Sequence, residues 1–290
     1  MPTADGPSEY VSTRRIGDAA ISVISEGTLE WSPKMNAPEE ELRRAIPELA
    51  ERGKFTLGLN LAYVALADAS ILIDPGFDDP KSSWQKRFAA KWPGSRRSPG
   101  LRAALDHLGV APSAVTHVLI THAHADHFAG VAVERDGRDV VRFPQARHFI
   151  GRQDWLENPA HEDPASELAG RLGMVDRLGL LEVVEAEREV APGVTIIPAP
   201  GETPGHCVVR VRSAGQRFYY MGDLFHHPCE VVHPGWIPAN RDPEATGMSR
   251  RRVYAEAAAS GATVVFSHDL FPAWGRILAT NGAFRWESAQ

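Results

Sequence analysis

Short apolar runs separated by turn-forming residues dominate the hydrophobic pattern of this chain. Residues 61–67 (LAYVALA) and 70–73 (SILI) are two such runs, divided by Asp68 and Ala69 and followed by the turn sequence DPG at 74–76. Apolar runs bounded by Asp, Gly and Pro are typical of strands, so this segment is predicted to be a β-hairpin that leads into a turn. Further strands are predicted at 20–25, 115–121, 147–150, 181–184, 194–199, 207–211, 218–221, 263–267 and near 276–286.

Helical segments are predicted between these strands, at about 39–52, 81–92, 99–108, 153–156, 166–172 and 243–259. The first follows Pro38 and opens with three glutamates, which favour a helix N-terminus. The third ends before Gly109, a residue typical of a helix C-terminus. Strands and helices are interspersed in both halves of the chain, and two sheets packed face to face with helices outside satisfy this pattern. The predicted fold class is α/β.

No linker, low-complexity tract or short repeat divides the chain. Residues 1–18 are therefore predicted to be a loose N-terminal arm, and residues 19–290 a single domain. Two interpretations of segment 27–57 stay open, a lid over a functional site and a contact in a homodimer. The basic cluster at 250–252 is expected to be an exposed helix face, as most charge runs are.

Composition excludes several classes of function. With 31 Lys plus Arg against 37 Asp plus Glu, the net charge is -6, which argues against a nucleic-acid partner. The polar first ten residues lack the apolar segment of a secretory signal, and the most apolar window, 57–76, is interrupted by Asn60, Asp68 and Asp74. No membrane span is expected, and a cytoplasmic location is predicted. Two cysteines are too few for a disulfide framework or a cysteine-based zinc site.

Histidine is concentrated in one place. Three of the twelve histidines lie within the six residues HAHADH at 122–127, directly after a predicted strand. His122 and His124, separated by a small alanine, can hold one metal ion, and Asp126 and His127 can reach a neighbouring one. Imidazole and carboxylate are the ligands that suit zinc and similar metals. A His-rich exposed loop is the alternative, but four ligand types with small spacers behind a strand favour a metal site.

One loop cannot complete two coordination spheres, so further ligands are expected at other strand ends. His206 follows the turn Thr203-Pro204-Gly205 and begins a strand. Asp223 and His268 each follow a predicted strand at its end. Loops at strand ends are where sites in layered α/β proteins tend to be built.

These residues resemble the metallo-β-lactamase fold superfamily, over roughly residues 18–286. HAHADH matches its HxHxDH motif, and TPGH at 203–206, GD at 222–223 and SH at 267–268 follow in the family's order. The resemblance implies an αββα sandwich of two mixed sheets with helices on the outer faces. It also implies two divalent metal ions at one edge of the sandwich. Zinc is the first expectation for these ions, and manganese, cobalt and iron are the alternatives. The resemblance further implies that His122, His124 and His206 bind one metal, that Asp126, His127 and His268 bind the other, and that Asp223 bridges them.

Departures from other family members narrow the expected chemistry. Flavodiiron proteins have Glu where His124 stands, and true β-lactamases generally lack the carboxylate at Asp223. Glyoxalase II adds a helical domain after the last ligand, whereas 22 residues follow His268 here. The remaining resemblance is to acyl-homoserine lactone lactonases and methyl parathion hydrolase. The lactonases have Tyr where this chain has His226.

The resemblance thus predicts a hydrolase of a small-molecule ester, lactone or related bond that uses a metal-bridging hydroxide, with Asp126 and His226 as catalytic residues. His226 either serves the reaction or only packs beside His227. Asp74 either accepts a hydrogen bond from a ligand histidine or only caps its turn. Phosphotriester or β-lactam hydrolysis, a mononuclear iron oxidoreductase of the persulfide dioxygenase type and an inactive binding module are the alternatives. Apolar pocket residues are expected among Phe128, Phe225, Trp236, Phe271 and Trp274.

Overall fold

The computed structural model describes residues 8–280 and 282–289, whose strands form two large sheets and one separate hairpin. The first sheet has the order β1-β2-β3-β4-β6-β9-β10, with β5 beside β2. Its strands are β1 (Val11–Ile16), β2 (Ala19–Trp31), β3 (Phe55–Ala65), β4 (Ser70–Ile73), β5 (Arg96–Arg97), β6 (His117–Leu119), β9 (Arg147–Gly151) and β10 (Leu181–Val184). It is mixed, because β4, β6, β9 and β10 run parallel and the others antiparallel.

The second sheet runs from β11 to β17 in chain order, and only its β14–β15 pair is parallel. Its strands are β11 (Arg188–Ala191), β12 (Val194–Pro198), β13 (Cys207–Ser213), β14 (Gln216–Tyr220), β15 (Thr263–Val265), β16 (Gly275–Thr280) and β17 (Ala283–Ser288). The separate hairpin pairs β7 (Ala132–Arg135) with β8 (Arg138–Val141).

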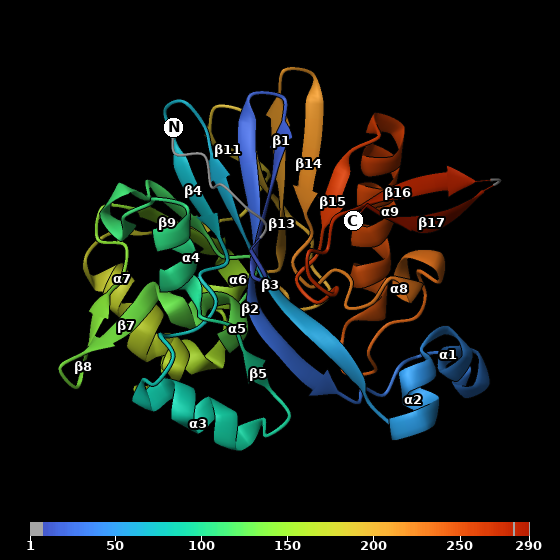
Figure 1. Cartoon of the computed structure of the whole chain (residues 1–290), viewed down its shortest axis with the longest axis horizontal. Helices are drawn as coiled ribbons and strands as arrows, with labels where there is room; N and C mark the ends of the chain where they lie inside the picture. The colour runs from blue at the N-terminus through green and yellow to red at the C-terminus, as the bar shows by residue number, and fades with distance from the viewer. Residues whose placement is uncertain (1–7, 281, 290) are drawn as a thin grey trace.

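Helices lie on both sides of the two sheets (Figure 1). The α-helices are α1 (Glu39–Ala45), α2 (Pro47–Arg52), α3 (Ser83–Lys91), α4 (Leu101–His107), α5 (Ala125–Phe128), α6 (Arg152–Leu156), α7 (Gly173–Arg177), α8 (Cys229–Val232) and α9 (Pro243–Ser260). The 3-10 and π segments are η1 (Pro112–Ala114), η2 (Ala129–Val131), η3 (Pro159–His161) and η4 (Leu168–Leu172).

Alternation along the strands sends side chains into separate apolar layers. On β4, Ile71 and Ile73 join the core between the two sheets, whereas Leu72 joins the layer that contains Leu105 of α4. The outer face of the second sheet packs against Tyr254 and neighbouring residues of α9. Each sheet therefore has one face against the other sheet and one against helices, which confirms the predicted αββα sandwich.

Part of the predicted loose arm at 1–18 is a regular element, and residues 1–7 of the arm lie outside the described residues. Residues 11–16 form β1, which pairs with β2 along its whole length. Gly17, with a positive φ of 60°, and Asp18 make a two-residue turn between the two strands. A two-residue turn with glycine is a typical hairpin signal. Because of this hairpin, the domain includes β1 and begins before residue 19, the predicted boundary.

Several element boundaries also differ from the prediction. The helix expected at 39–52 is two helices, because Pro47 lacks the amide proton that a continuous helix needs. The strand expected near 276–286 is the hairpin β16–β17, and the helix expected at 166–172 is mostly the π segment η4. Arg250 is buried with 1% exposure, so only Arg251 and Arg252 of the basic cluster lie on an exposed face.

Candidate metal centre

Strand ends of both sheets bring the seven predicted ligands to one edge of the sandwich. His122 and His124 follow β6, and Asp126 and His127 lie in the short helix α5. The remaining three flank strands of the second sheet, with His206 directly before β13, Asp223 after β14 and His268 after β15. The polypeptide segments therefore converge as predicted, although the assignment of these side chains as metal ligands stays a prediction.

Asp223 lies between two groups of side chains. On one side, its Oδ2 is 3.5 Å from Nε2 of His122, which is itself 2.8 Å from Nδ1 of His124. On the other side, its Oδ1 is 3.3 Å from Nε2 of His127, and its Oδ2 is 2.9 Å from Nε2 of His268. A carboxylate in this position can contact two cations at once.

Asp126 and His206 complete the predicted set in different ways. Oδ2 of Asp126 lies 3.5 Å from Nε2 of His127 and 3.7 Å from Nε2 of His268. His206 packs with its ring 5.2 Å from that of His122, but its Nε2 faces the backbone nitrogen of Asp223 at 3.1 Å. The ligand atoms of His122, His124, Asp223 and Glu202, not His206, lie within 4.8 Å of one another.

Hydrogen bonds fix the orientation of three of the histidines predicted to be ligands. Nδ1 of His127 lies 2.8 Å from Asp74, Nδ1 of His206 lies 3.0 Å from the carbonyl of Ala199, and Nδ1 of His268 lies 2.8 Å from the carbonyl of Gly58. Carboxylate and carbonyl oxygens accept, so Nδ1 donates in each case. The lone pair of a neutral ring is then on Nε2, which is the atom that a metal can bind.

Asp74 accepts a hydrogen bond from His127, as expected for a carboxylate that orients a predicted ligand histidine. It is fully buried and, besides accepting from His127, it accepts from the backbone amide and the hydroxyl of Thr121 at 2.7 and 2.8 Å. Its φ of 55° is unusual for a residue with a side chain. The turn therefore holds its carboxylate against the segment in which the HAHADH loop begins.

Asp154 is a buried residue of the site that the sequence reasoning missed. Its carboxylate accepts hydrogen bonds from the amides of Ala123 and Gly205, at 2.8 and 2.7 Å, and from the hydroxyl of Thr203 at 2.6 Å. It thus joins the HAHADH loop to the TPGH turn. The one available signal was its position, three residues after strand β9, because carboxyl ends of neighbouring parallel strands meet at one edge.

The electrostatics of the cluster favour a bound cation. Burial, with the neighbouring His127 adding to it, holds the pKa of His122 well below its ordinary value, so its ring is neutral and able to bind a metal. Burial also opposes charge on His127, but Asp223, Asp126 and Asp74 raise its pKa well above the ordinary value. Carboxylates this deeply buried need positive charge nearby. A divalent cation supplies it without protonated histidines.

Unpartnered polar atoms also fit a metal site. Nε2 of His127 and Oδ1 of Asp223 are buried and make no hydrogen bond within residues 8–280 and 282–289. Buried polar groups in folded proteins nearly always have a partner. These two atoms lie 3.3 Å apart, and imidazole nitrogen with carboxylate oxygen is a donor set that suits zinc and related divalent metals.

His226 lies beside the cluster between two buried carboxylates. Its Nε2 is 3.7 Å from Glu202, and its Nδ1 is 3.7 Å from Glu230. Burial alone lowers the pKa of His226, but the charges of Glu202 and Glu230 raise it to about 10. The ring also packs against Trp31, with the centroids 4.7 Å apart. His226 is thus a hydrogen-bond donor held next to Asp223.

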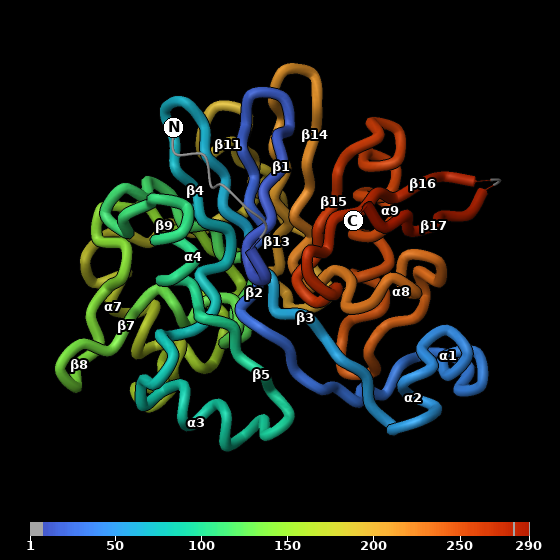
Figure 2. The backbone as a smooth tube through the Cα atoms, viewed as in Figure 1, coloured from blue at the N-terminus to red at the C-terminus, as the bar shows by residue number. Residues whose placement is uncertain are grey.

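The cluster opens into a cleft of about 620 Å³ whose other walls combine apolar residues with the polar side chains of Arg87, Lys91, Glu167, Asn240 and Arg241. Strands β2 and β3, helix α3 and the residue that follows α3 supply the large apolar side chains, which are Leu29, Trp31, Leu57, Trp84, Phe88 and Trp92. The aromatic residues predicted from their closeness to the motifs are not among those that line it. Segment 27–57 contributes three of the wall residues, on the β2–β3 ribbon that extends from the sandwich toward α1 and α2 (Figure 2).

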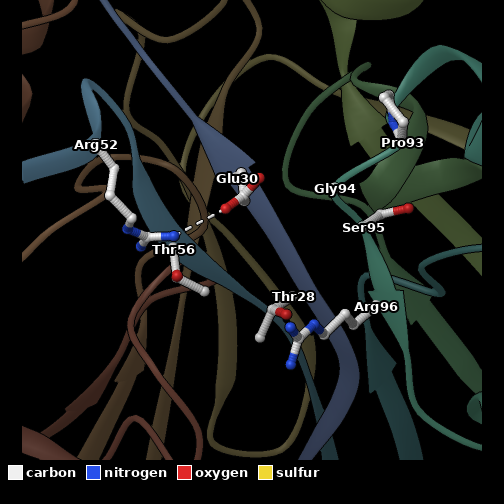
Figure 3. Close-up of a pocket in the computed structure, with 8 residues that line it drawn as sticks. All are labelled: Thr28, Glu30, Arg52, Thr56, Pro93, Gly94, Ser95 and Arg96. Carbon is white, nitrogen blue, oxygen red and sulfur yellow. Dashed lines mark hydrogen bonds and ion pairs between the residues drawn. The ribbon is translucent and has the colours of Figure 1, made fainter. Parts of the chain in front are cut away.

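A second hollow lies on the opposite face of the β2–β3 ribbon. Thr28, Glu30 and Thr56 line it, each next in sequence to residues that line the cleft, because neighbouring side chains of a strand point to opposite faces. Arg52 crosses it to pair with Glu30, as Figure 3 shows. None of the seven predicted ligands lines this hollow.

Fold and site together define a class of α/β sandwich proteins with a histidine and carboxylate cluster at one edge. Residues 56–268 match the metallo-beta-lactamase superfamily, and the chain belongs to it. Superfamily hydrolases of this kind are metal-dependent enzymes. In the part of the chain that the structure describes, no helix has the length and apolar character needed to cross a membrane.

Curated relatives match part of the chain. A probable metallo-hydrolase of Mycobacterium tuberculosis is 24% identical over 184 residues, which are 58% of this chain and 57% of that protein. The hydroxyacylglutathione hydrolase of Xanthomonas euvesicatoria pv. vesicatoria is 26% identical over 178 residues, 61% of this chain and 50% of that protein. The chain thus spans little more than half of the length of the first of these relatives and half of the second.

Solved structures match nearly the whole chain. AidC, described as a dizinc quorum-quenching lactonase, has a TM-score of 0.75 at 20% identity and covers 97% of this chain and 98% of its own. The hydrolase AbOPH has a TM-score of 0.76 at 23% identity and covers 98% of this chain and 99% of its own. At such low identity these similarities establish the fold.

Proposed function

We propose that this chain is a dinuclear metal-dependent hydrolase that cleaves an ester or lactone bond in a small molecule. The observation that carries the proposal is the position of Asp223. Its Oδ2 lies 3.5 Å from Nε2 of His122 on one side and 2.9 Å from Nε2 of His268 on the other. Its Oδ1 lies 3.3 Å from Nε2 of His127. A single buried carboxylate shared by two groups of imidazoles is suited to hold two cations.

The residues divide between two cations, zinc being the first expectation. One cation would be held by His122, His124 and His206, the other by Asp126, His127 and His268, and both by Asp223. When bound, two such ions supply Lewis acidity and a water of lowered pKa as the nucleophile. The chain itself orients the ligand rings through Asp74 and backbone carbonyls, so that little reorganisation is needed when a cation enters.

His226 is proposed as the residue that meets the substrate oxygen. Its ring lines the cleft, and the carboxylates of Glu202 and Glu230 keep it protonated. A donor fixed beside Asp223 can hydrogen-bond to an oxygen on which negative charge develops during attack on a carbonyl. It can also give its proton to the alkoxide that leaves. Asp126, the other residue predicted to be catalytic, borders the same opening, and its Oδ2 lies 3.5 Å from Nε2 of His127.

The cleft supports an ester or lactone with an apolar acyl or aryl portion. Trp31, Phe88 and Trp92 offer contact surface beside the proposed ligands, and ligand sites commonly combine apolar walls with a few polar groups. The description of AidC as a dizinc lactonase supports the same class of bond.

Metal removal and a substrate panel test the proposal. Dialysis against a strong chelator should abolish hydrolysis of lactones and aryl esters, and added zinc, cobalt or manganese should restore it. Elemental analysis should find two divalent ions per chain, and Asp223→Ala should lower both metal content and rate. Unimpaired turnover by the metal-free protein would refute the mechanism. A single iron with oxygen consumption on a persulfide would support the oxidoreductase alternative instead.

A further inference from the structure

Glu202 is a carboxylate of the metal centre that the family motifs do not assign. It directly precedes the TPGH turn, and only 2% of its side chain is exposed. Its Oε1 lies 3.3 Å from Nδ1 of His124, the same nitrogen that faces Nε2 of His122 at 2.8 Å. This Oε1 is buried, and its cationic partner among the described residues is the guanidinium of Arg241. A buried carboxylate oxygen thus lies between the Arg241 guanidinium and the ring of His124 in the first ligand group.

Contacts with the start of α9 fix the backbone that carries Glu202. The carbonyl of Gly201 accepts from the amide of Asp242 at 3.2 Å, and the carbonyl of Pro200 accepts from the hydroxyl of Ser249 at 2.7 Å. Gly201 has a φ of 145°, and a Cβ added there would come within 2.2 Å of Oγ1 of Thr246. This close packing places Glu202 independently of any cation.

Arg241 supplies the charge that lets a carboxylate be buried here. Its guanidinium pairs with both oxygens of Glu202, while 16% of its side chain stays exposed to the cleft. A carboxylate has lone pairs beyond those that one guanidinium occupies. Oε1 can therefore bind a second positive group on the side that faces His124.

The metal-binding nitrogen of His206 lies apart from the other ligand atoms of the first group. Its Nε2 accepts from the backbone amide of Asp223 at 3.1 Å, and it is absent from the set of ligand atoms that lie within 4.8 Å of one another. That set consists of atoms from His122, His124, Asp223 and Glu202. The oxygen of Glu202 thus belongs to the compact set of ligand atoms, and the Nε2 of His206 does not.

We propose that Glu202 is a further ligand of the first cation, beside His122, His124, His206 and Asp223. The inference rests on the proposed dinuclear centre. With Glu202, the first site holds two carboxylates, and oxygen ligands suit harder cations such as manganese better than nitrogen ligands do. Glu202 therefore lowers the preference of the first site for zinc over manganese, and the Arg241 ion pair limits the negative charge that the extra carboxylate adds.

Metal titration of matched variants tests this role without using activity. The metal-free parent, Glu202→Gln and Glu167→Gln are each titrated with zinc and with manganese against a competing chelator. Glu167 is the control, because it is an exposed carboxylate that lines the same cleft but belongs to none of the ligand groups among the described residues. Glu202→Gln should weaken binding of one equivalent at least about 10-fold, more for manganese than for zinc. Glu167→Gln should bind as the parent does.

A double variant excludes an effect of the guanidinium left behind. Glu202→Gln combined with Arg241→Gln removes both members of the ion pair, and the loss of affinity should persist in a protein whose near-UV circular dichroism matches the parent. Parent-like affinities and an unchanged zinc-to-manganese ratio in both variants would overturn the inference. A parent that binds neither metal would instead refute the proposed function, so the two failures are distinguishable.

Discussion

Replacing Arg250 by methionine tests how the loop that carries His226 is held in place. Arg250 reaches from α9 under this loop, and its guanidinium donates to the carbonyls of Leu224, Pro234 and Trp236 at 2.9, 3.0 and 2.9 Å. It also pairs with the buried carboxylate of Glu230. Methionine is of similar length and apolar, so it fills the space but provides none of these donors.

The expected loss of stability follows from the burial of the pair. Arg250 and Glu230 each have 1% side-chain exposure, so water cannot replace the missing guanidinium. Removing one partner of a buried ion pair costs about 3–5 kcal/mol, because the other charge is left uncompensated. Three carbonyls lose a donor as well, which places the expected loss toward the upper end of that range. The Tm of a domain of this size should fall by roughly 10 °C.

Denaturant unfolding followed by tryptophan fluorescence measures this loss, provided that the slope with denaturant is the same in parent and variant. Arg251→Met is the matched control, because Arg251 neighbours Arg250 on the same helix but is exposed. It should change stability by less than about 0.5 kcal/mol. Adding Glu230→Gln to Arg250→Met should recover part of the loss, since the amide still accepts from the backbone of His226 and His227 but carries no charge.

Equal stability of Arg250→Met and Arg251→Met would refute the buried position of Arg250. A double variant that is less stable than Arg250→Met would show that the uncompensated charge of Glu230 is not the main cost. Hydrolysis provides a separate readout, because a loop that loses its anchor should misplace His226. The rate should fall even under conditions in which the variant remains fully folded.

Three further predictions concern single side chains. Asp154→Ala should weaken metal binding and lower the free energy of unfolding by about 2–4 kcal/mol, because three buried donors lose their acceptor. Chelator competition measures the first effect, and denaturant unfolding measures the second. His226→Phe should leave the metal content intact and lower kcat at least about 10-fold, and unchanged kinetics would leave it only a packing role. His148 is fully buried, and burial lowers its pKa to about 4. The unfolded chain therefore binds the extra proton below about pH 6.5, and the parent should lose about 2 kcal/mol between pH 7 and pH 5 relative to His148→Leu.

The first ligand loop could be predicted from the sequence because its information is local. His122, His124, Asp126 and His127 are close in the chain, and the strand before them needs only its own apolar pattern to be recognised. The predicted ligands His206, Asp223 and His268 were selected in the same way, since each lies directly beside a strand. The pattern could not give the distances between these side chains, because two residues at strand ends meet only if their strands end at the same edge of the sandwich.

Residues whose role depends on the tertiary structure escaped the sequence reasoning. Asp154 and Glu202 resemble any other loop carboxylates until β9 and α9 bring them against the ligand loops. Arg250 stands among three arginines, and consecutive residues of a helix point about 100° apart, so one of the three can face inward while the others do not. Net charge and charge runs do not reveal which one, because the answer depends on what packs against the helix.

The contacts of the ligand rings explain how the cluster keeps its geometry. Two of the three fixed Nδ1 atoms, those of His206 and His268, donate to backbone carbonyls, which no single side-chain substitution removes. Only the ring of His127 depends on another side chain, Asp74, whose carboxylate is at the same time bound to the segment that begins the ligand loop. The orientation of the ligands is therefore built into the strand ends themselves. In the proposed centre, cations would add binding energy to a site whose shape the fold has already determined. Variation of the cleft walls could then change the substrate without moving the proposed ligands.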